Sequence, residues 1–172
     1  NKDRLIDSPV ALSHFESSDT EDQLWNKLAG TLLRDYGITS MLYAFTHSKY
    51  TVSRTGIMPS IYFRHNFPED YLATYPNGLT LDDSVAASLL LEGRTHLLWS
   101  DFETLELSEC QRRRVGTDKY CGMGVGLSLG FRFGANNGVA GLCMAAQQAD
   151  AKQFNDSMLP RMAEIRSHCS TF

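Results

Sequence analysis

The chain has 172 residues, of which 42% are hydrophobic and 21% are charged. This composition is that of an ordinary globular domain and excludes a disordered, collagen-like or coiled-coil chain. The formal net charge of −4 has the wrong sign for a surface that grips nucleic acid phosphates. Every apolar stretch is shorter than the roughly 20 residues of a bilayer span, and no signal sequence is evident. We therefore expect one cytoplasmic domain, residues 1–172, with no membrane partner.

The first half of the chain predicts a helix followed by two paired strands. Residues 19–36 have leucines at helical spacing after capping candidates such as Thr20, and Gly37 ends the pattern. Alternating β-favouring residues then predict strands over 41–45 and 61–65. We expect these two strands to be antiparallel neighbours.

The middle of the chain predicts three further helices. Pro68 suits the first helical position of a short helix that carries Tyr71 and Tyr75 one turn apart. Residues 81–84 are predicted to cap a helix over 85–91, which places Asp83 near its start, and residues 107–119 form the next helix. The run 112–114 of three arginines follows two glutamates, and we interpret it as a solvated, ion-paired face.

The last third predicts a hairpin and a closing helix. Strands over 125–133 and 139–146 flank a Gly- and Asn-rich connection, and a helix over 151–168, interrupted at Pro160, buries Phe154 and Ile165. This order predicts an α/β (α+β) fold in which an antiparallel β-sheet is sandwiched between helices, an α-β-α sensor domain. A ligand pocket would lie between one sheet face and its helices.

Motifs for catalysis or metal binding are missing from the sequence. There is no G-x-S-x-G nucleophile elbow, and the five histidines are dispersed. The four cysteines also lack C-x-x-C spacing, so we expect reduced core thiols. They are Cys110, Cys121, Cys143 and Cys169. We therefore predict no metal site, no cofactor and no enzyme activity.

An ordered set of aromatic and acidic residues remains. It runs from Asn66-Phe67-Pro68 through Tyr71 and Tyr75 to Asp83, and ends at the distant Trp99. This set resembles the autoinducer-binding domain of LuxR-type quorum-sensing transcription factors, and the resemblance covers most of the chain. It implies a small-molecule signal, an acyl-homoserine lactone, held in a homodimer. It also implies that DNA is bound only through a C-terminal helix-turn-helix domain outside this chain.

The resemblance assigns a role to each head-group residue. Asp83 matches the family's aspartate that accepts a hydrogen bond from the ligand amide N–H, and Trp99 matches the tryptophan that packs on the lactone ring. Tyr75 matches the tyrosine beside the acyl amide. Ser128 and Cys143 match strand positions that often carry a hydroxyl near the amide carbonyl. Physical chemistry independently supports a ligand that donates to Asp83. A carboxylate in an apolar pocket is costly unless it accepts a hydrogen bond, and a hydrogen bond to a charged group contributes roughly 1.5–3 kcal/mol.

Four positions depart from the family's pattern. Phe67 stands where a hydroxyl-bearing tyrosine is usual and Tyr71 where tryptophan is usual. Ser84 and Gly130 stand where proline is usual or common. Two head-group donors are thereby lost, which favours an orphan or solo regulator of this type.

Strand alternation nominates four residues for the acyl-chain region, with ordinary core packing as an equal alternative. They are Leu42, Ala44, Ile61 and Phe63. Two alternatives to a lactone sensor stay open: a ligand-independent dimerisation module with the same fold, and an enzyme acting on a small amphiphile.

Overall fold

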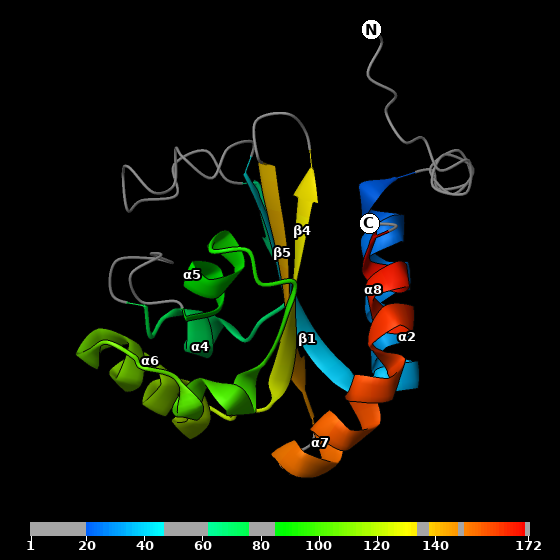
Figure 1. Cartoon of the computed structure of the whole chain (residues 1–172). Coiled ribbons are helices and arrows are strands. Elements are labelled where there is room, and N and C mark those ends of the chain that lie inside the picture. Colours follow the sequence, from blue (N-terminus) through cyan, green and yellow to red (C-terminus); the bar gives the residue numbers. More distant parts are fainter. Residues whose placement is uncertain (1–19, 47–61, 76–84, 134–137, 148–149, 171–172) are drawn as a thin grey trace, which may run out of the picture.

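The computed structural model describes residues 20–46, 62–75, 85–133, 138–147 and 150–170. Its centre is a five-stranded antiparallel sheet in the order β2-β1-β5-β4-β3, with helices on both faces (Figure 1). The strands are β1 (Ile38–Thr46), β2 (Tyr62–His65), β3 (His96–Leu98), β4 (Gly126–Phe133) and β5 (Gly138–Ala146). The predicted α-β-α class, the antiparallel pair β1/β2 and the antiparallel pair β4/β5 are confirmed.

One helical layer comprises α2 (Glu21–Tyr36), α7 (Ala151–Met158) and α8 (Met162–Ser170) (Figure 1). Thr20 caps α2 by accepting a hydrogen bond from Gln23 N, and Gly37 ends it in the left-handed region. The Pro160 break is confirmed as a 3-10 turn between α7 and α8. These helices bury Leu32, Phe154 and other apolar side chains against the sheet, and this is the main hydrophobic core.

The opposite layer contains α4 (Glu69–Leu72), α5 (Val85–Leu91), the 3-10 helix η1 (Trp99–Thr104) and α6 (Glu109–Tyr120). Figure 1 shows α4, α5 and α6 together on this side of the sheet. Residues of β4 and β5 alternate between the two layers, so that Leu127 and Met144 join the main core. Gly126, Ser128 and Cys143 therefore face the α4–α6 side.

The observed elements differ from the prediction in four places. β3 and η1 were not predicted, because three strand residues are too few to show alternation. Pro68 is the N-cap of α4 rather than its first helical residue. Leu33 was expected on the apolar face of α2 but has 52% of its surface exposed, and Trp25 is buried instead. Cys110 and Cys121 are exposed at the two ends of α6 and are not core thiols.

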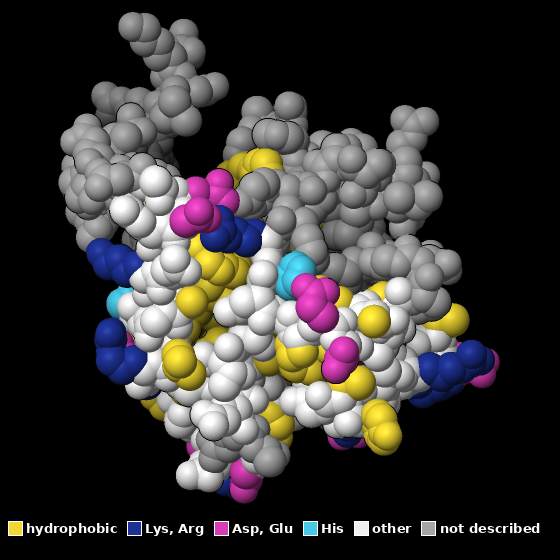
Figure 2. Space-filling model, turned by 180° about the vertical axis from the view of Figure 1, so that it is seen from behind, with side chains coloured by type: hydrophobic (Ala, Val, Ile, Leu, Met, Phe, Trp, Pro, Cys, Tyr) yellow, Lys and Arg dark blue, Asp and Glu magenta, His cyan; other side chains and the backbone are white. Residues whose placement is uncertain are grey.

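The surface charge agrees with the sequence composition. On the face in Figure 2, acidic and basic side chains are interspersed, and the Lys and Arg side chains that this view shows do not gather in one patch. None of the described helices has the length and apolar character that a membrane span needs.

Candidate ligand-binding site

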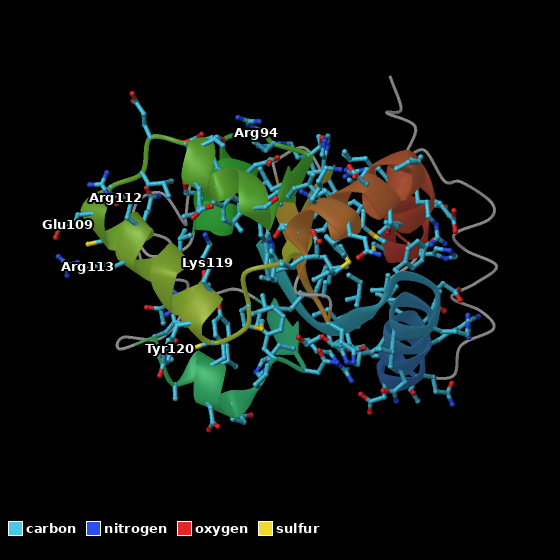
Figure 3. All side chains as sticks on the ribbon, turned by 90° about the horizontal axis from the view of Figure 1, so that it is seen from below. Arg94, Glu109, Arg112, Arg113, Lys119 and Tyr120 are labelled. Carbon is cyan, nitrogen blue, oxygen red and sulfur yellow. The ribbon has the colours of Figure 1, made fainter. Side chains whose placement is uncertain are left out.

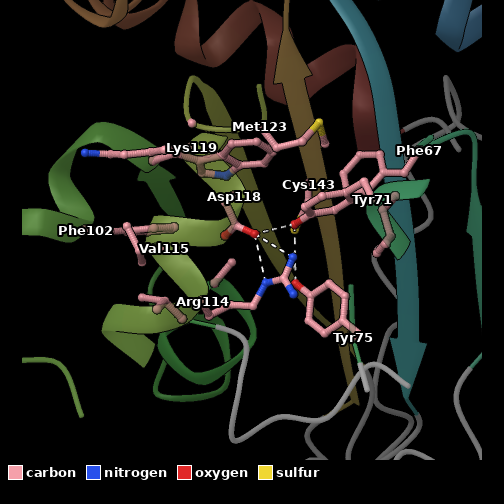
Figure 4. A pocket seen from close by; sticks show the side chains of 15 residues that line it. Phe67, Tyr71, Tyr75, Phe102, Arg114, Val115, Asp118, Lys119, Met123 and Cys143 are labelled. Atoms are coloured by element: carbon pink, nitrogen blue, oxygen red, sulfur yellow. Dashed lines mark hydrogen bonds and ion pairs between the residues drawn. The ribbon is translucent and has the colours of Figure 1, made fainter. Parts of the chain in front are cut away.

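A cavity of about 80 Å³ lies between the sheet and the α4–α6 layer. β1, β5, α4, α5, η1 and α6 all contribute to its wall, which is mostly apolar (Figure 4). Six of the residues nominated from the sequence line it: Leu42, Phe67, Tyr71, Tyr75, Trp99 and Cys143. Tertiary folding thus brings together residues that are up to 101 positions apart, from Leu42 to Cys143.

The aromatic side of the cavity is built around α4. Asn66 anchors the start of this segment to β1, because its side chain accepts from Met41 N at 2.6 Å and its own N–H donates to Met41 O at 3.0 Å. The Phe67 and Tyr71 rings then meet edge to face, with centroids 5.7 Å apart. Tyr71 and Tyr75 meet in the same way at 5.9 Å. The prediction that one helix carries both is wrong, because α4 ends at Leu72 and Tyr75 follows it.

Trp99 is held against the sheet by a hydrogen-bonded chain. Its indole Nε1–H donates to Ser128 Oγ at 2.8 Å, and Ser128 Oγ donates to Cys143 Sγ at 3.2 Å across the β4/β5 register. A Cβ on Gly126 would lie 2.6 Å from the Trp99 ring, so only glycine allows this close approach. Ser128 is fully buried behind Trp99 and does not line the cavity. Burial raises the pKa of the Cys143 thiol to about 11, so the thiol is neutral.

An ion pair on α6 enters the same cavity and was missed from the sequence. Arg114 Nη2 lies 2.8 Å from Asp118 Oδ1, and the Arg114 side chain is only 7% exposed. The guanidinium stacks 3.5 Å from the Tyr75 ring centroid and donates to Thr74 Oγ1 at 2.9 Å. Tyr71 Oη donates to Asp118 Oδ1 at 2.8 Å. Four side chains thus converge in the cavity (Figure 4): Tyr71, Tyr75, Arg114 and Asp118.

The interpretation of residues 112–114 as a solvated face is therefore wrong for Arg114. Arg112 and Arg113 do point outward, and Arg113 pairs with Glu109 at 2.5 Å (Figure 3). Arg114 lies about 100° further round the helix and faces the sheet. The i, i+4 spacing of Arg114 and Asp118 was a usable signal for the pair, but it did not indicate burial.

Burial controls the protonation of the polar side of the cavity. It raises the pKa of Asp118, although Arg114 and the Tyr71 hydroxyl act in the opposite direction. Burial also raises the pKa of both Tyr71 and Tyr75, so these phenols stay protonated and can donate hydrogen bonds at neutral pH. The cavity wall therefore contains an acceptor, Asp118, and two protonated phenols, of which Tyr71 already donates to Asp118.

Besides Ser128, four nominated residues cannot be assigned to the cavity. Asp83 and Ile61 lie outside the described residues. Phe63 is in β2 opposite Ala44 of β1, but the described residues do not include its side chain. Ala44 is half-buried and packs against the Phe67–Tyr71 cluster next to the cavity. In the described part of the chain, no three His, Cys, Asp or Glu side chains are placed to hold a metal ion.

An antiparallel sheet with an aromatic-walled cavity under one helical layer is an arrangement typical of a small-molecule-binding domain. Residues 20–170 match the family model of the autoinducer binding domain. The chain belongs to this family, and the resemblance to LuxR-type quorum-sensing regulators is confirmed. No curated protein sequence matches the chain.

Solved structures show the same fold at low sequence identity. CepR2 from Burkholderia cenocepacia, an N-acylhomoserine lactone-dependent LuxR family transcription factor, has 13% identity and a TM-score of 0.67, with 95% of this chain and 92% of CepR2 covered. SdiA from Escherichia coli has 12% identity and a TM-score of 0.58 over 95% of this chain and 65% of SdiA. SdiA in complex with octanoyl-rac-glycerol has 14% identity and a TM-score of 0.59, with 99% and 67% covered. This chain thus spans about two thirds of SdiA.

Proposed function

We propose that this domain binds an uncharged amphiphilic signal, an acyl-homoserine lactone or a related molecule, between the sheet and the α4–α6 layer. The observation that carries the proposal is the convergence of Phe67, Tyr71, Tyr75 and Trp99 on one cavity with Leu42 and Cys143 at the sheet. Such apolar walls with a few polar groups are typical of small-molecule sites. The neighbouring structures support an amphiphile, since CepR2 is described as lactone-dependent and SdiA was solved with an acylglycerol.

The head-group chemistry follows from which polar atoms are already engaged. Trp99 Nε1–H is used by Ser128, and Tyr71 Oη is used by Asp118. Phe67 has no hydroxyl to offer. We infer that Asp83 accepts the ligand's amide N–H, as the family resemblance implies, and that Trp99 supports the head group through ring contact rather than through a donated hydrogen bond.

The regulatory output of this domain is also a proposal. We infer that the domain forms homodimers, acts in the cytoplasm and controls a C-terminal helix-turn-helix domain, through which alone the protein contacts DNA. We further infer that it does not catalyse a reaction. Light scattering and operator-binding assays on the full-length regulator, with and without ligand, test the dimer and the DNA contact.

One observation favours a second function, the ligand-independent dimerisation module. The cavity of about 80 Å³ is smaller than the roughly 300–1,000 Å³ of typical ligand pockets, and the buried Arg114 side chain occupies part of this region. On this hypothesis no amphiphile would stabilise the fold, and an Asp83→Asn variant of the full-length regulator would keep its regulatory activity.

Thermal denaturation with a panel of ligands separates the two functions. A ligand that binds only the folded state adds about 2.7 kcal/mol at 100 times its Kd, which for a chain of this length raises Tm by about 5–10 °C. The panel contains acyl-homoserine lactones from butanoyl to dodecanoyl and octanoyl-rac-glycerol. No shift with any member would overturn the sensor proposal.

A matched pair of variants locates the binding site. Cys143→Leu adds volume at a side chain that lines the cavity, whereas Cys110→Leu makes the same change at the exposed start of α6. We expect the ligand-induced rise in Tm to disappear in the first variant and to persist in the second. An unchanged rise in both would move the binding site elsewhere.

A further inference from the structure

The pair Arg114–Asp118 on α6 is the least expected feature of the cavity, and the inference drawn from it rests on the proposed ligand-binding function. Both residues line the cavity, and more than nine-tenths of the Arg114 side chain is buried. A buried charge pair is weak evidence for stability, because removing two charges from water offsets most of their attraction. A direct role in binding gives the pair a reason to lie there.

The hydrogen bonds of Asp118 are unevenly divided between its two oxygens. Oδ1 accepts from Tyr71 Oη at 2.8 Å and from Arg114 Nε at 2.9 Å, and Arg114 Nη2 lies 2.8 Å away. Within the described part of the chain, no donor reaches Oδ2. A carboxylate can accept at both oxygens, so Asp118 keeps an unused acceptor beside an apolar cavity.

Arg114 is almost completely engaged but keeps one donor. Nε and Nη2 are directed to Asp118 and to Thr74 Oγ1, while Nη1 donates to Thr74 O at 3.3 Å. Of the two N–H groups on Nη1, one is left without an acceptor among the described residues. The pair therefore keeps one unused acceptor, on Asp118, and one unused donor, on Arg114.

We propose that Asp118, held by Arg114 and Tyr71, is a ligand-binding carboxylate that accepts a hydrogen bond from a hydroxyl group on the uncharged head of an amphiphile. A hydroxyl fits this site because it is an uncharged group that can donate to Asp118 Oδ2. The lining residues around the pair, such as Phe102, Val115 and Met123, contact the apolar part of the ligand.

The ligand head is uncharged because the pair already balances its own charge. The guanidinium of arginine stays protonated in proteins, and Asp118 is the counterion of Arg114. An anionic head such as a fatty-acid carboxylate would add an uncompensated charge to a low-dielectric site, which is strongly unfavourable. The chemical class is therefore a neutral, hydroxyl-bearing amphiphile, for example a monoacylglycerol.

Calorimetric titration with three probes of equal acyl length tests this assignment. The probes are octanoyl-rac-glycerol, methyl octanoate, which has no donor, and N-octanoyl-homoserine lactone. We expect the whole 172-residue chain to bind octanoylglycerol at least tenfold more tightly than methyl octanoate. Asp118→Asn should weaken octanoylglycerol binding by about 10- to 100-fold, as expected for loss of a charged acceptor, and should leave methyl octanoate binding unchanged.

Two further variants keep the test decisive. Because Asp118→Asn leaves Arg114 as a lone buried charge and can impair folding, the double variant Arg114→Gln/Asp118→Asn removes both charges and should lose the same preference for the glycerol ester. Asp156→Asn is the matched control. Asp156 belongs to another i, i+4 ion pair, on α7, and its side chain is 62% exposed. This variant should bind all probes like the wild type.

The outcomes distinguish this inference from the proposed function. If the lactone binds but octanoylglycerol does not, or if Asp118→Asn weakens all three probes equally, the sensor function stands and the role of Asp118 is overturned. If no probe binds the wild-type chain, the sensor function itself fails, and the assignment of Asp118 fails with it.

Discussion

Removing Arg114 should destabilise the domain in a pH-dependent way. In Arg114→Met the apolar stem is kept, but Asp118 remains in the cavity wall without its counterion. Breaking a buried ion pair by removing one partner lowers the free energy of unfolding by about 3–5 kcal/mol. Because the Asp118 side chain is 21% exposed, we expect the lower end of that range, about 3 kcal/mol. For a chain of this length, this lowers Tm by about 6–12 °C.

The pH dependence follows from the direction of the Asp118 pKa shift. Burial raises the pKa of Asp118 in the folded protein. Between the pKa of the unfolded chain and that of the folded protein, the folded state therefore binds more protons than the unfolded chain. The contribution of Asp118 to the free energy of unfolding therefore falls as the pH rises from the unfolded pKa through the folded pKa. Without Arg114 the folded pKa is higher still. The variant should thus lose more stability than the wild type between about pH 4 and pH 7.

Urea denaturation at about pH 4 and about pH 7 measures these effects on the free energy of unfolding. Arg113→Met is the control, since Arg113 is the neighbouring arginine in an i, i+4 pair whose two side chains are both 72% exposed, and its loss should change stability by less than about 1 kcal/mol. In Arg114→Met/Asp118→Asn the uncompensated charge is gone, so the loss should be smaller than the sum of the single losses by about 1–2 kcal/mol. Additive losses that are equal at both pH values would refute the reasoning.

Three further experiments probe Trp99 and the sheet residues that pack behind it. Gly126→Ala places a Cβ 2.3 Å from Met144 O and 2.6 Å from the Trp99 ring. We expect the free energy of unfolding to fall by about 1–3 kcal/mol and the tryptophan fluorescence to change. Unchanged fluorescence would contradict the close packing. Ser128→Ala leaves the Trp99 Nε1–H without its acceptor and should lower the free energy of unfolding in urea by about 1–3 kcal/mol, whereas Ser170→Ala at the exposed end of α8 should change it little. Iodoacetamide should modify the exposed Cys110 and Cys121 well before Cys143, because burial raises the pKa of Cys143 to about 11; equal rates by mass spectrometry would show that the cavity is open.

Local sequence patterns determined the elements whose signals lie within the element itself. Thr20 and Gly37 mark the two ends of α2, and they predict these ends because capping involves only residues of one helical turn. An alternating run likewise predicted β1, and a Gly- and Asn-rich hairpin connection predicted β4 and β5 on either side of it. The aromatic set Phe67, Tyr71, Tyr75 and Trp99 was found by its order along the chain, and the fold brings it to one cavity.

Only the tertiary structure decided which side of α6 is buried and what chemistry the cavity wall contains. Residues 109–120 include charged side chains all around the helix and no apolar stripe, so helical periodicity could not orient it. Contact with Tyr75, Thr74 and Tyr71 of the α4 segment turns Arg114 and Asp118 inward. The short β3 and the stacking of Trp99 on Gly126 depend in the same way on β4, which is distant in sequence. Burial of a charged side chain requires partners from other elements, and the sequence of one helix does not contain them.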